Sequence, residues 1–289
     1  GDLEYFDDIN FMKGAIVYSD KVTTVSRTYA KEIQDPYYGE GLEGMLQKRK
    51  DDLSGIINGL DYDDYDPETD KYVPFKYNVS NAIARKGDNK EELQKKLGLP
   101  VNRSIPLIGM VTRLVEAKGL DLVTRIMDEL LEYEDVQFVL LGTGDRQYED
   151  WFKGLVWRYP KKVSANIFFN NELAHQIYAA SDLFLMPSQY EPCGIGQLIA
   201  LRYGSIPIVR ATGGLKDTVE AFNNYTNTGN GFSFNNYNAH ELLFSIKRAI
   251  DSVSELSKRQ HIMENAMTAD YSWTESAKQY KDLYNSLTK

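Results

Sequence analysis

The amino-acid sequence predicts an α/β protein built on a parallel sheet with helices on both faces. Two observations carry this prediction. Short, almost wholly apolar segments recur from Pro106 onward, and each is followed by a segment with helical periodicity. Strands that are buried on both faces read as continuous apolar runs. Regular alternation of strand and helix is typical of parallel sheets, because parallel neighbours need a crossover connection.

The alternation runs through six expected strands, six expected helices and a helical tail. The strands are expected at Leu107–Val111, Val136–Leu141, Asn166–Phe169, Leu183–Met186, Ile206–Val209 and Gly231–Phe234. The helices are expected at 119–132, 146–158, 172–181, 196–203, 215–222 and 239–252. The tail runs from Ser254 to Leu287, and its Tyr280 and Tyr284 share one helical face at i,i+4 spacing, which is suited to docking.

The residues before Pro106 predict less regular structure. One β-rich segment, Val22–Val25, precedes Ser26, which is a good N-cap for a helix through Ile33. One strand and its helices cannot close a core, so this part is interpreted as the end of a domain. Residues 35–105 are rich in Asp, Gly, Asn, Pro and Tyr, and they predict an irregular connection.

Composition and charge narrow the class of protein. The 289 residues carry a net charge of −9 without a block of Lys or Arg, which disfavours nucleic acid and anionic membranes as partners. The single cysteine, Cys193, excludes an intrachain disulfide and favours a reducing cytoplasm. No apolar run reaches the ~18 residues that span a bilayer. The acidic start, Gly1–Glu4, lacks the basic region of a signal peptide.

The run from Pro187 to Leu198 carries the strongest functional signal. It places Glu191 in a turn at the carboxyl end of an apolar strand, next to Pro192 and Gly194, which fix the turn. Ligands of open α/β sheets bind at that edge. The plainer alternative is a solvated loop glutamate beside a cis or kinked proline.

Three other groups follow expected strands. Arg113 and Lys118 together can neutralise a diphosphate, or they can be ordinary surface cations. Gly142 and Gly144 form a short Gly-x-Gly turn that admits a ligand close to the backbone, but it lacks the third glycine of a dinucleotide fingerprint. The segment Thr212-Gly213-Gly214 begins a helix whose amides and dipole suit a phosphate, although it can also be a plain turn.

The ordered combination of these motifs resembles bacterial glycogen synthase and plant starch synthase, glycosyltransferase family 5. The matching segments are Gly55–Asp61, Arg113–Leu122, Leu141–Asp145, Glu191–Gly194 and Thr212–Val219, and the similarity extends from Phe11 to Tyr284. The resemblance implies a GT-B fold, in which two Rossmann-like doubly wound domains face each other across a cleft. It also implies transfer of glucose from ADP-glucose to the non-reducing end of an α-1,4-glucan with retention of configuration, without a metal or further cofactor.

The resemblance assigns a role to each candidate residue. Arg113 and Lys118 would hold the distal phosphate and stabilise the departing ADP. Glu191 would contact the donor glucose and support a positively charged transition state. Phe169 would stack on adenine, with a buried strand-end aromatic as its alternative. The expected lining of the sugar and phosphate pocket is completed by Asn58, Gly142, Gly144, Cys193, Gly194, Thr212, Gly213 and Gly214.

Two departures from the family pattern qualify these expectations. Gly196 stands where the family's Glu-Pro-Cys-Gly-Leu-Thr-Gln segment has threonine, which removes a hydroxyl near the donor. The family's Lys-Thr/Ser-Gly-Gly-Leu segment and a first-domain histidine are not found before Phe11. We therefore expect this chain to correspond to the carboxyl-terminal part of a family member, with its first domain supplied in cis or in trans.

The expected domain limits follow from this correspondence. Residues 1–55 would end the amino-terminal domain on the acceptor side, and 56–105 would connect the domains. Residues 106–253 would form the ADP-glucose-binding domain, and the helices of 254–289 would cross back. The chain alone is expected to be inactive. Two alternatives remain open: a non-catalytic module that binds ADP, ADP-glucose or glucan and regulates a partner, and a transferase of the same fold that uses UDP-glucose.

Overall fold

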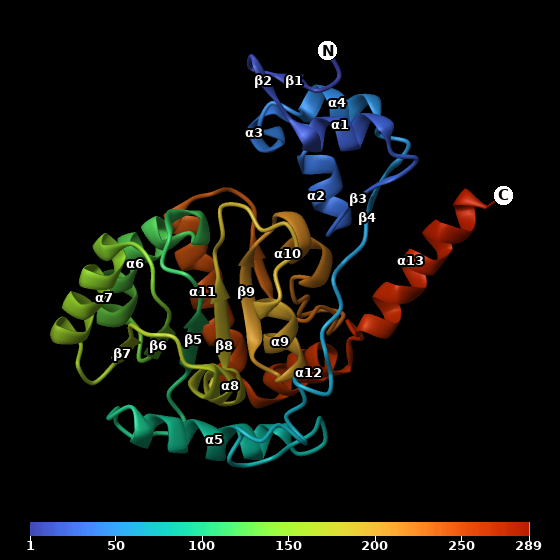
Figure 1. Cartoon of the computed structure of the whole chain (residues 1–289). Helices are drawn as coiled ribbons and strands as arrows, with labels where there is room; N and C mark the ends of the chain where they lie inside the picture. The colour runs from blue at the N-terminus through green and yellow to red at the C-terminus, as the bar shows by residue number, and fades with distance from the viewer. Residues whose placement is uncertain (289) are drawn as a thin grey trace.

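The structure, a computed structural model, describes residues 1–288 and is centred on a six-stranded, wholly parallel sheet (Figure 1). The strand order is β10-β9-β8-β5-β6-β7, and every neighbouring pair is parallel. The bounds are β5 Leu107–Val111, β6 Gln137–Leu141, β7 Val163–Asn166, β8 Leu183–Met186, β9 Ile206–Arg210 and β10 Phe232–Phe234. The predicted parallel α/β sheet is confirmed, and only β7 departs from its predicted limits by more than one residue.

Helices cover both faces of this sheet, as predicted. Alternate strand residues point to opposite faces. Leu107, Val139 and Leu141 pack against α8, whereas Ile108 and Phe138 belong to the cluster that includes α6, α7 and α11. The helices of the sheet domain are α6 Leu120–Tyr133, α7 Arg146–Arg158, α8 Asn171–Ala180, α9 Gly196–Arg202, α10 Gly213–Thr218, α11 Ala239–Ser254 and α12 Leu256–Thr268.

Two expected elements are corrected. The strand predicted at Asn166–Phe169 ends at Asn166, and Phe169 lies in a loop with 91% of its surface exposed. The apolar run there therefore marks a surface loop, not a core strand. The helix predicted at 215–222 begins at Gly213 and ends at Thr218, because Val219 turns to an extended backbone.

The irregular connection predicted over 35–105 is wrong for much of that range. It contains α3 Pro36–Gly39, α4 Glu43–Lys48, β4 Leu53–Gly55 and the fifteen-residue helix α5 Ala82–Lys96. Sequence reasoning missed α5 because most of the face that it buries is polar, with Lys86, Asn89, Lys90 and Gln94 all buried. An apolar stripe, the usual signal of a packed helix, is absent from it.

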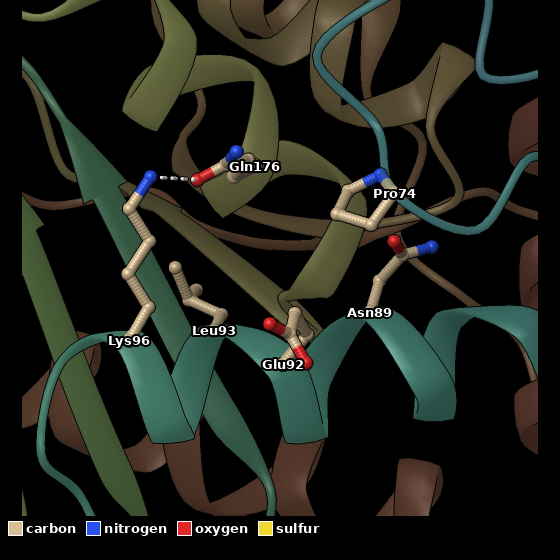
Figure 2. Close-up of a pocket in the computed structure, with 6 residues that line it drawn as sticks. All are labelled: Pro74, Asn89, Glu92, Leu93, Lys96 and Gln176. Carbon is tan, nitrogen blue, oxygen red and sulfur yellow. Dashed lines mark hydrogen bonds between the residues drawn. The ribbon is translucent and has the colours of Figure 1, made fainter.

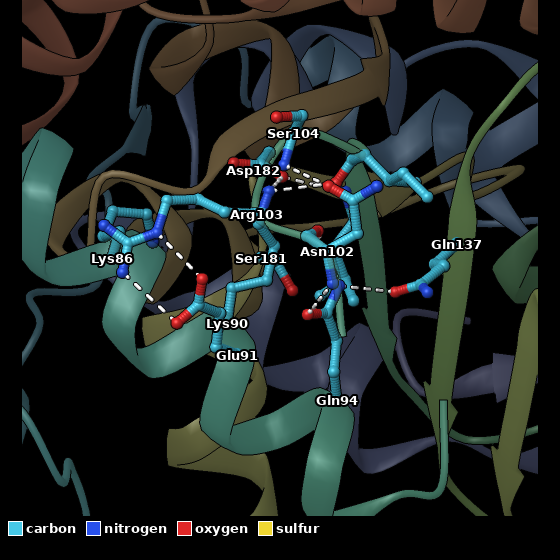
Figure 3. Close-up of polar contacts among 12 residues, drawn as sticks. Lys86, Lys90, Glu91, Gln94, Asn102, Arg103, Ser104, Gln137, Ser181 and Asp182 are labelled. Atoms are coloured by element: carbon cyan, nitrogen blue, oxygen red, sulfur yellow. Dashed lines mark hydrogen bonds and ion pairs between the residues drawn. The ribbon is translucent and has the colours of Figure 1, made fainter. Parts of the chain in front are cut away.

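Buried ion pairs and hydrogen bonds fix α5 to the sheet domain (Figure 3). The Lys86 ammonium donates to the carbonyls of Ala179 and Tyr203, both at 2.9 Å, which lie at the carboxyl ends of α8 and α9. Lys90 donates to Asp182 at 2.7 Å, and Arg259 reaches the other oxygen of that carboxylate, also at 2.7 Å. These charge-assisted contacts replace the apolar packing that most helices use.

A smaller unit precedes the sheet domain and faces the carboxyl edge of the sheet (Figure 1). Its elements are β1 Glu4–Tyr5, β2 Asp8–Ile9, α1 Phe11–Tyr18, β3 Val22–Thr24 and α2 Arg27–Glu32, followed by α3, α4 and β4. Ser26 accepts a hydrogen bond from the Tyr29 amide, which confirms the predicted N-cap. The predicted strand at Val22–Val25 is present as β3, and it pairs in parallel with β4, a strand that the sequence did not reveal.

The carboxyl-terminal helices diverge. α12 packs on α9 and β9, whereas α13 Trp273–Leu287 extends away from the sheet (Figure 1). Ser276 in α13 donates to the Ile57 carbonyl at 2.7 Å, so the tail contacts the connection between the two units. Within residues 1–288, no helix combines the length and apolar character needed to cross a membrane.

A small hollow of about 150 Å³ lies between α5, α8 and the connecting segment (Figure 2). It is lined by Pro74, Asn89, Glu92, Leu93, Lys96 and Gln176. None of the residues that the sequence analysis selected borders it. The hollow therefore reflects how α5 packs on α8, and it is separate from the candidate site.

Asp182 offers a test of the polar docking of α5. Burial raises its pKa, but Arg259, Lys90 and the Leu107 amide outweigh burial and hold the pKa below its ordinary value. The Asp182→Asn variant leaves the buried Lys90 and the partly buried Arg259 without a counterion, so we expect the free energy of unfolding in urea at pH 7 to fall by about 3 kcal/mol. The deficit should persist above about pH 4 and shrink as the pH falls through the lowered pKa.

Asp150→Asn is the matched control, because its ion pairs with Arg146 and Lys153 lie on the surface. This change should leave the unfolding midpoint unaltered. Equal stability of the two variants would show that the buried carboxylate does not hold α5 in place.

Candidate functional site

Most of the candidate residues gather where three neighbouring strands end. Strands β5, β8 and β9 are adjacent and parallel, so the loops that follow them meet at the carboxyl edge of the sheet. The Gln189 amide donates to the Ala117 carbonyl at 3.0 Å and joins the first two loops. The short 3-10 helix η1, Glu116–Lys118, brings Lys118 to this edge.

Glu191 is a buried carboxylate in the loop between β8 and α9, as the sequence predicts. One of its oxygens, Oε2, lies 2.7 Å from the Lys118 ammonium and 3.0 Å from the Ser188 hydroxyl. Only 8% of the residue is exposed, so it is not the solvated loop glutamate of the alternative. The peptide bonds are all trans within residues 1–288, which removes the cis-proline explanation as well.

The Glu191 loop packs directly on the first turn of α10. The Gly214 amide donates to the carbonyls of Glu191 at 3.0 Å and Pro192 at 3.2 Å. A Cβ atom on either Gly213 or Gly214 would come within 2.0 Å of a carbonyl oxygen of this loop, and Gly213 has a φ of +46°. Glycine is required at both positions because the two backbones touch.

Cys193 lies in the same loop and is buried. Burial raises the pKa of its thiol, and the nearby backbone amide of Asn58 acts in the opposite direction. The predicted cleft residue Asn58 is therefore brought to the predicted pocket residue Cys193. Gly194 follows with a φ of +74°, and the Gln197 side chain donates to its carbonyl.

Arg113 and Phe169 border a separate hollow of about 220 Å³, formed by the ends of β5 and β6 and by the loop between β7 and α8. The lining includes Gly142, Thr143, Asn170 and Asn171. Phe169 is not the buried strand-end aromatic of the alternative, since its ring is exposed at the rim. Within residues 1–288 the Arg113 guanidinium meets no hydrogen-bond or ion-pair partner, so at the border of the hollow it is available to an anion.

The glycines of the Gly-x-Gly turn serve the packing of two loops. A Cβ atom on Gly142 would lie 1.8 Å from the Thr112 carbonyl oxygen, and one on Gly144 would lie 2.4 Å from that of Leu114. The loop after β6 can therefore lie against the loop after β5 only with glycine at these positions. A direct role of Gly142 and Gly144 toward a ligand stays a prediction.

One acidic residue enters the site that sequence reasoning did not select. Glu32, at the end of α2, accepts hydrogen bonds from the Gly213 amide at 3.1 Å and from the Thr212 hydroxyl at 3.0 Å. The amides proposed as a phosphate seat are thus engaged within the protein. No local pattern marks Glu32, because its partners lie about 180 residues later in the chain. Ser188 was also missed, although its place three residues before Glu191 was a usable signal.

Family comparisons agree with this architecture. The description "Glycosyl transferases group 1" matches residues 89–268, and "Starch synthase catalytic domain" matches residues 1–48. The glycogen synthase of Clostridium acetobutylicum is 57% identical over 99% of this chain, and that of Lachnospira eligens is 54% identical over 99%. The chain spans about 60% of the length of these curated relatives.

Solved structures confirm the GT-B fold. The catalytic domain of starch synthase IV from Arabidopsis thaliana, bound to ADP and acarbose, has a TM-score of 0.91 and 38% identity. The match covers 98% of this chain and 59% of that one. The sucrose-phosphate synthase of Thermosynechococcus elongatus, with a TM-score of 0.65 and 20% identity, covers 99% of this chain and 64% of its own, and it shares the fold.

Gly142 provides a test of the loop packing. Gly142→Ala forces a methyl group against the Thr112 carbonyl, so we expect a loss of about 1–3 kcal/mol in the free energy of unfolding. Gly154→Ala is the control, because that glycine lies inside α7 and a Cβ atom there would meet only the Arg158 side chain of the same helix, at 3.6 Å. Alanine should stabilise α7 slightly. Urea unfolding measures the stability of both variants. An unchanged free energy of unfolding for Gly142→Ala would contradict the close approach of the two loops.

Proposed function

We propose, from the premise that this chain belongs to the group 1 glycosyltransferases and matches glycogen synthases, that it forms the nucleotide-sugar-binding part of a retaining glucosyltransferase. The donor is ADP-glucose, and the acceptor is the non-reducing end of an α-1,4-glucan. One observation carries the proposal: the buried Glu191 carboxylate pairs with Lys118 at the carboxyl edge of the sheet, next to the hollow bordered by Arg113 and Phe169.

The proposed donor occupies the hollow beside Arg113 and Phe169 and extends to the Lys118–Glu191 pair. Adenine stacks on the exposed Phe169 ring, and the diphosphate extends past Arg113 toward Lys118. The donor glucose then lies beside Glu191, Cys193 and the first turn of α10. The starch synthase structure with ADP and acarbose supports this ligand class, because the two chains share 38% identity across nearly all of the present chain.

The proposed charges match the chemistry of transfer. The bond from the glucose anomeric carbon to the phosphate oxygen breaks, and ADP departs with the electron pair. A bond forms from that carbon to an acceptor hydroxyl, whose proton passes to the leaving diphosphate. Arg113 and Lys118 neutralise the negative charge that grows on ADP, while Glu191 stabilises the positive charge on the sugar.

The division of the chain stays part of the proposal. Residues 1–55 are assigned to the acceptor-side domain and 56–105 to the connection between domains. Residues 106–253 are assigned to the donor domain and 254–289 to the returning helices, for which the contact of Ser276 with Ile57 is a supporting observation. A reducing compartment such as the cytoplasm suits the single buried thiol of Cys193.

Calorimetry with ADP tests the proposal. Residues 1–289 should bind ADP weakly yet transfer no glucose to glycogen, because the opposite domain must close and exclude water. Restoring the preceding domain should restore transfer. Arg113→Ala should weaken ADP binding by on the order of tenfold or more. Arg146→Ala should leave ADP binding unchanged, because that side chain is solvent-exposed and its ion pair with Asp150 lies on the surface.

Three outcomes of this experiment would change the assignment. Transfer by residues 1–289 alone would contradict the two-domain mechanism. Selective binding of UDP over ADP would favour the transferase that uses UDP-glucose. Activity that stays absent after the preceding domain is restored, with ADP still bound, would favour the non-catalytic regulatory module.

Glu191→Gln separates catalysis from nucleotide binding in the two-domain enzyme. The amide keeps the shape of the side chain but removes its charge, so turnover should fall on the order of 100-fold or more while ADP affinity changes little. Initial-rate kinetics and calorimetry measure the two quantities. A parallel loss of both would assign Glu191 to folding, not to the transition state.

A further inference from the structure

Helices α2 and α10 are joined at both ends by carboxylates, one from each helix. The Asp217 carboxylate of α10 accepts from the amide and hydroxyl of Thr28, at 2.9 and 2.5 Å, at the start of α2. The Glu32 carboxylate at the end of α2 accepts from Gly213 and Thr212 at the start of α10. The two helices are therefore antiparallel, and each satisfies amide groups that the other leaves open at its first turn.

The Glu32 contact continues into the Glu191 loop. Glu32 fixes the Gly213 amide, and the next amide, Gly214, donates to the carbonyls of Glu191 and Pro192. The two consecutive amides of Gly213 and Gly214 thus join α2 to the backbone that carries the proposed catalytic carboxylate. No side chain of Gly213 or Gly214 can support the turn, so its position depends on these partners.

Buried polar side chains also hold the first turn of α10 against the Glu191 loop. The Thr218 hydroxyl donates to the Gly214 carbonyl at 2.7 Å, and the Gln197 amide donates to Thr218 at 3.2 Å and to Cys193 at 3.0 Å. Gln197 and Thr218 are almost wholly buried. Such a network transmits a displacement of the first turn of α10 to the loop, because its members cannot exchange their partners for water.

We propose that Glu32 is a positioning residue that sets the placement of the Glu191–Cys193 loop through the first turn of α10. Since α2 belongs to the amino-terminal unit, its docking on α10 couples the placement of that unit to the geometry of Glu191. The consequence for glucose transfer rests on the proposed function. The coupling itself rests only on the contacts of Glu32, Gly213 and Gly214.

The sole thiol of the chain reports on this coupling. Cys193 is buried in the loop that Glu32 is proposed to hold, so its reaction with a thiol reagent requires the loop to open. Glu32→Gln removes the charge that strengthens the bonds to α10 while keeping the size of the side chain. We expect the labelling rate of Cys193 at 25 °C to rise on the order of tenfold.

Two controls separate loop opening from general loss of stability. Lys31→Gln changes an exposed residue of the same helix and should leave the labelling rate unchanged. Asp182→Asn, at the opposite edge of the sheet, should lower stability more than Glu32→Gln without a comparable rise in labelling. Asp217→Asn, which frees the other end of α2, should raise the labelling rate as Glu32→Gln does.

The proposal is overturned if Glu32→Gln and Glu32→Ala label at the wild-type rate, or if Asp182→Asn labels as fast as they do. Because the measurement needs no nucleotide, it decides the inference even if ADP fails to bind. Conversely, ADP binding by the wild-type chain with unchanged labelling of the Glu32 variants would retain the proposed function and remove the positioning role.

Discussion

The parallel pairing of β5 with β8, and of β8 with β9, is the constraint on which the candidate site depends. Parallel neighbours place their carboxyl ends together, so three loops distant in sequence meet at one edge. At the opposite ends of these strands, Asp182 accepts from Lys90, Arg259 and the Leu107 amide and ties α5 and α12 to the sheet. The edge that anchors the fold is thus separate from the edge that carries the chemistry.

At the carboxyl edge, the loops are packed by backbone contacts that exclude side chains. Gly142 lies against Thr112, and Gly214 lies against the carbonyl of Cys193. Burial of Glu191 has a cost in such a place, since a charge loses its hydration. The Lys118 ammonium and the Ser188 hydroxyl offset that cost and leave the carboxylate fixed in position, as an electrostatic role at a sugar would require.

Much of this arrangement could be predicted from sequence because it depends on local patterns. Apolar runs located five of the six sheet strands, and the turn after β8 gave the position of Glu191. The apolar pattern failed where burial does not follow polarity: α5 buries lysines, whereas Phe168 and Phe169 are exposed. Glu32 could not be predicted from the sequence for another reason. Its partners come from a different unit, and only the assembled fold brings them together.

A crystal structure of the chain with ADP would show whether the loops after β5, β7, β8 and β9 form one nucleotide-sugar site. We expect adenine to lie on the Phe169 ring, with the diphosphate within hydrogen-bond reach of Arg113 and Lys118. The terminal phosphate should point toward Glu191. ADP bound elsewhere, for example in the hollow between α5 and α8, would contradict this assignment of the nucleotide-sugar site.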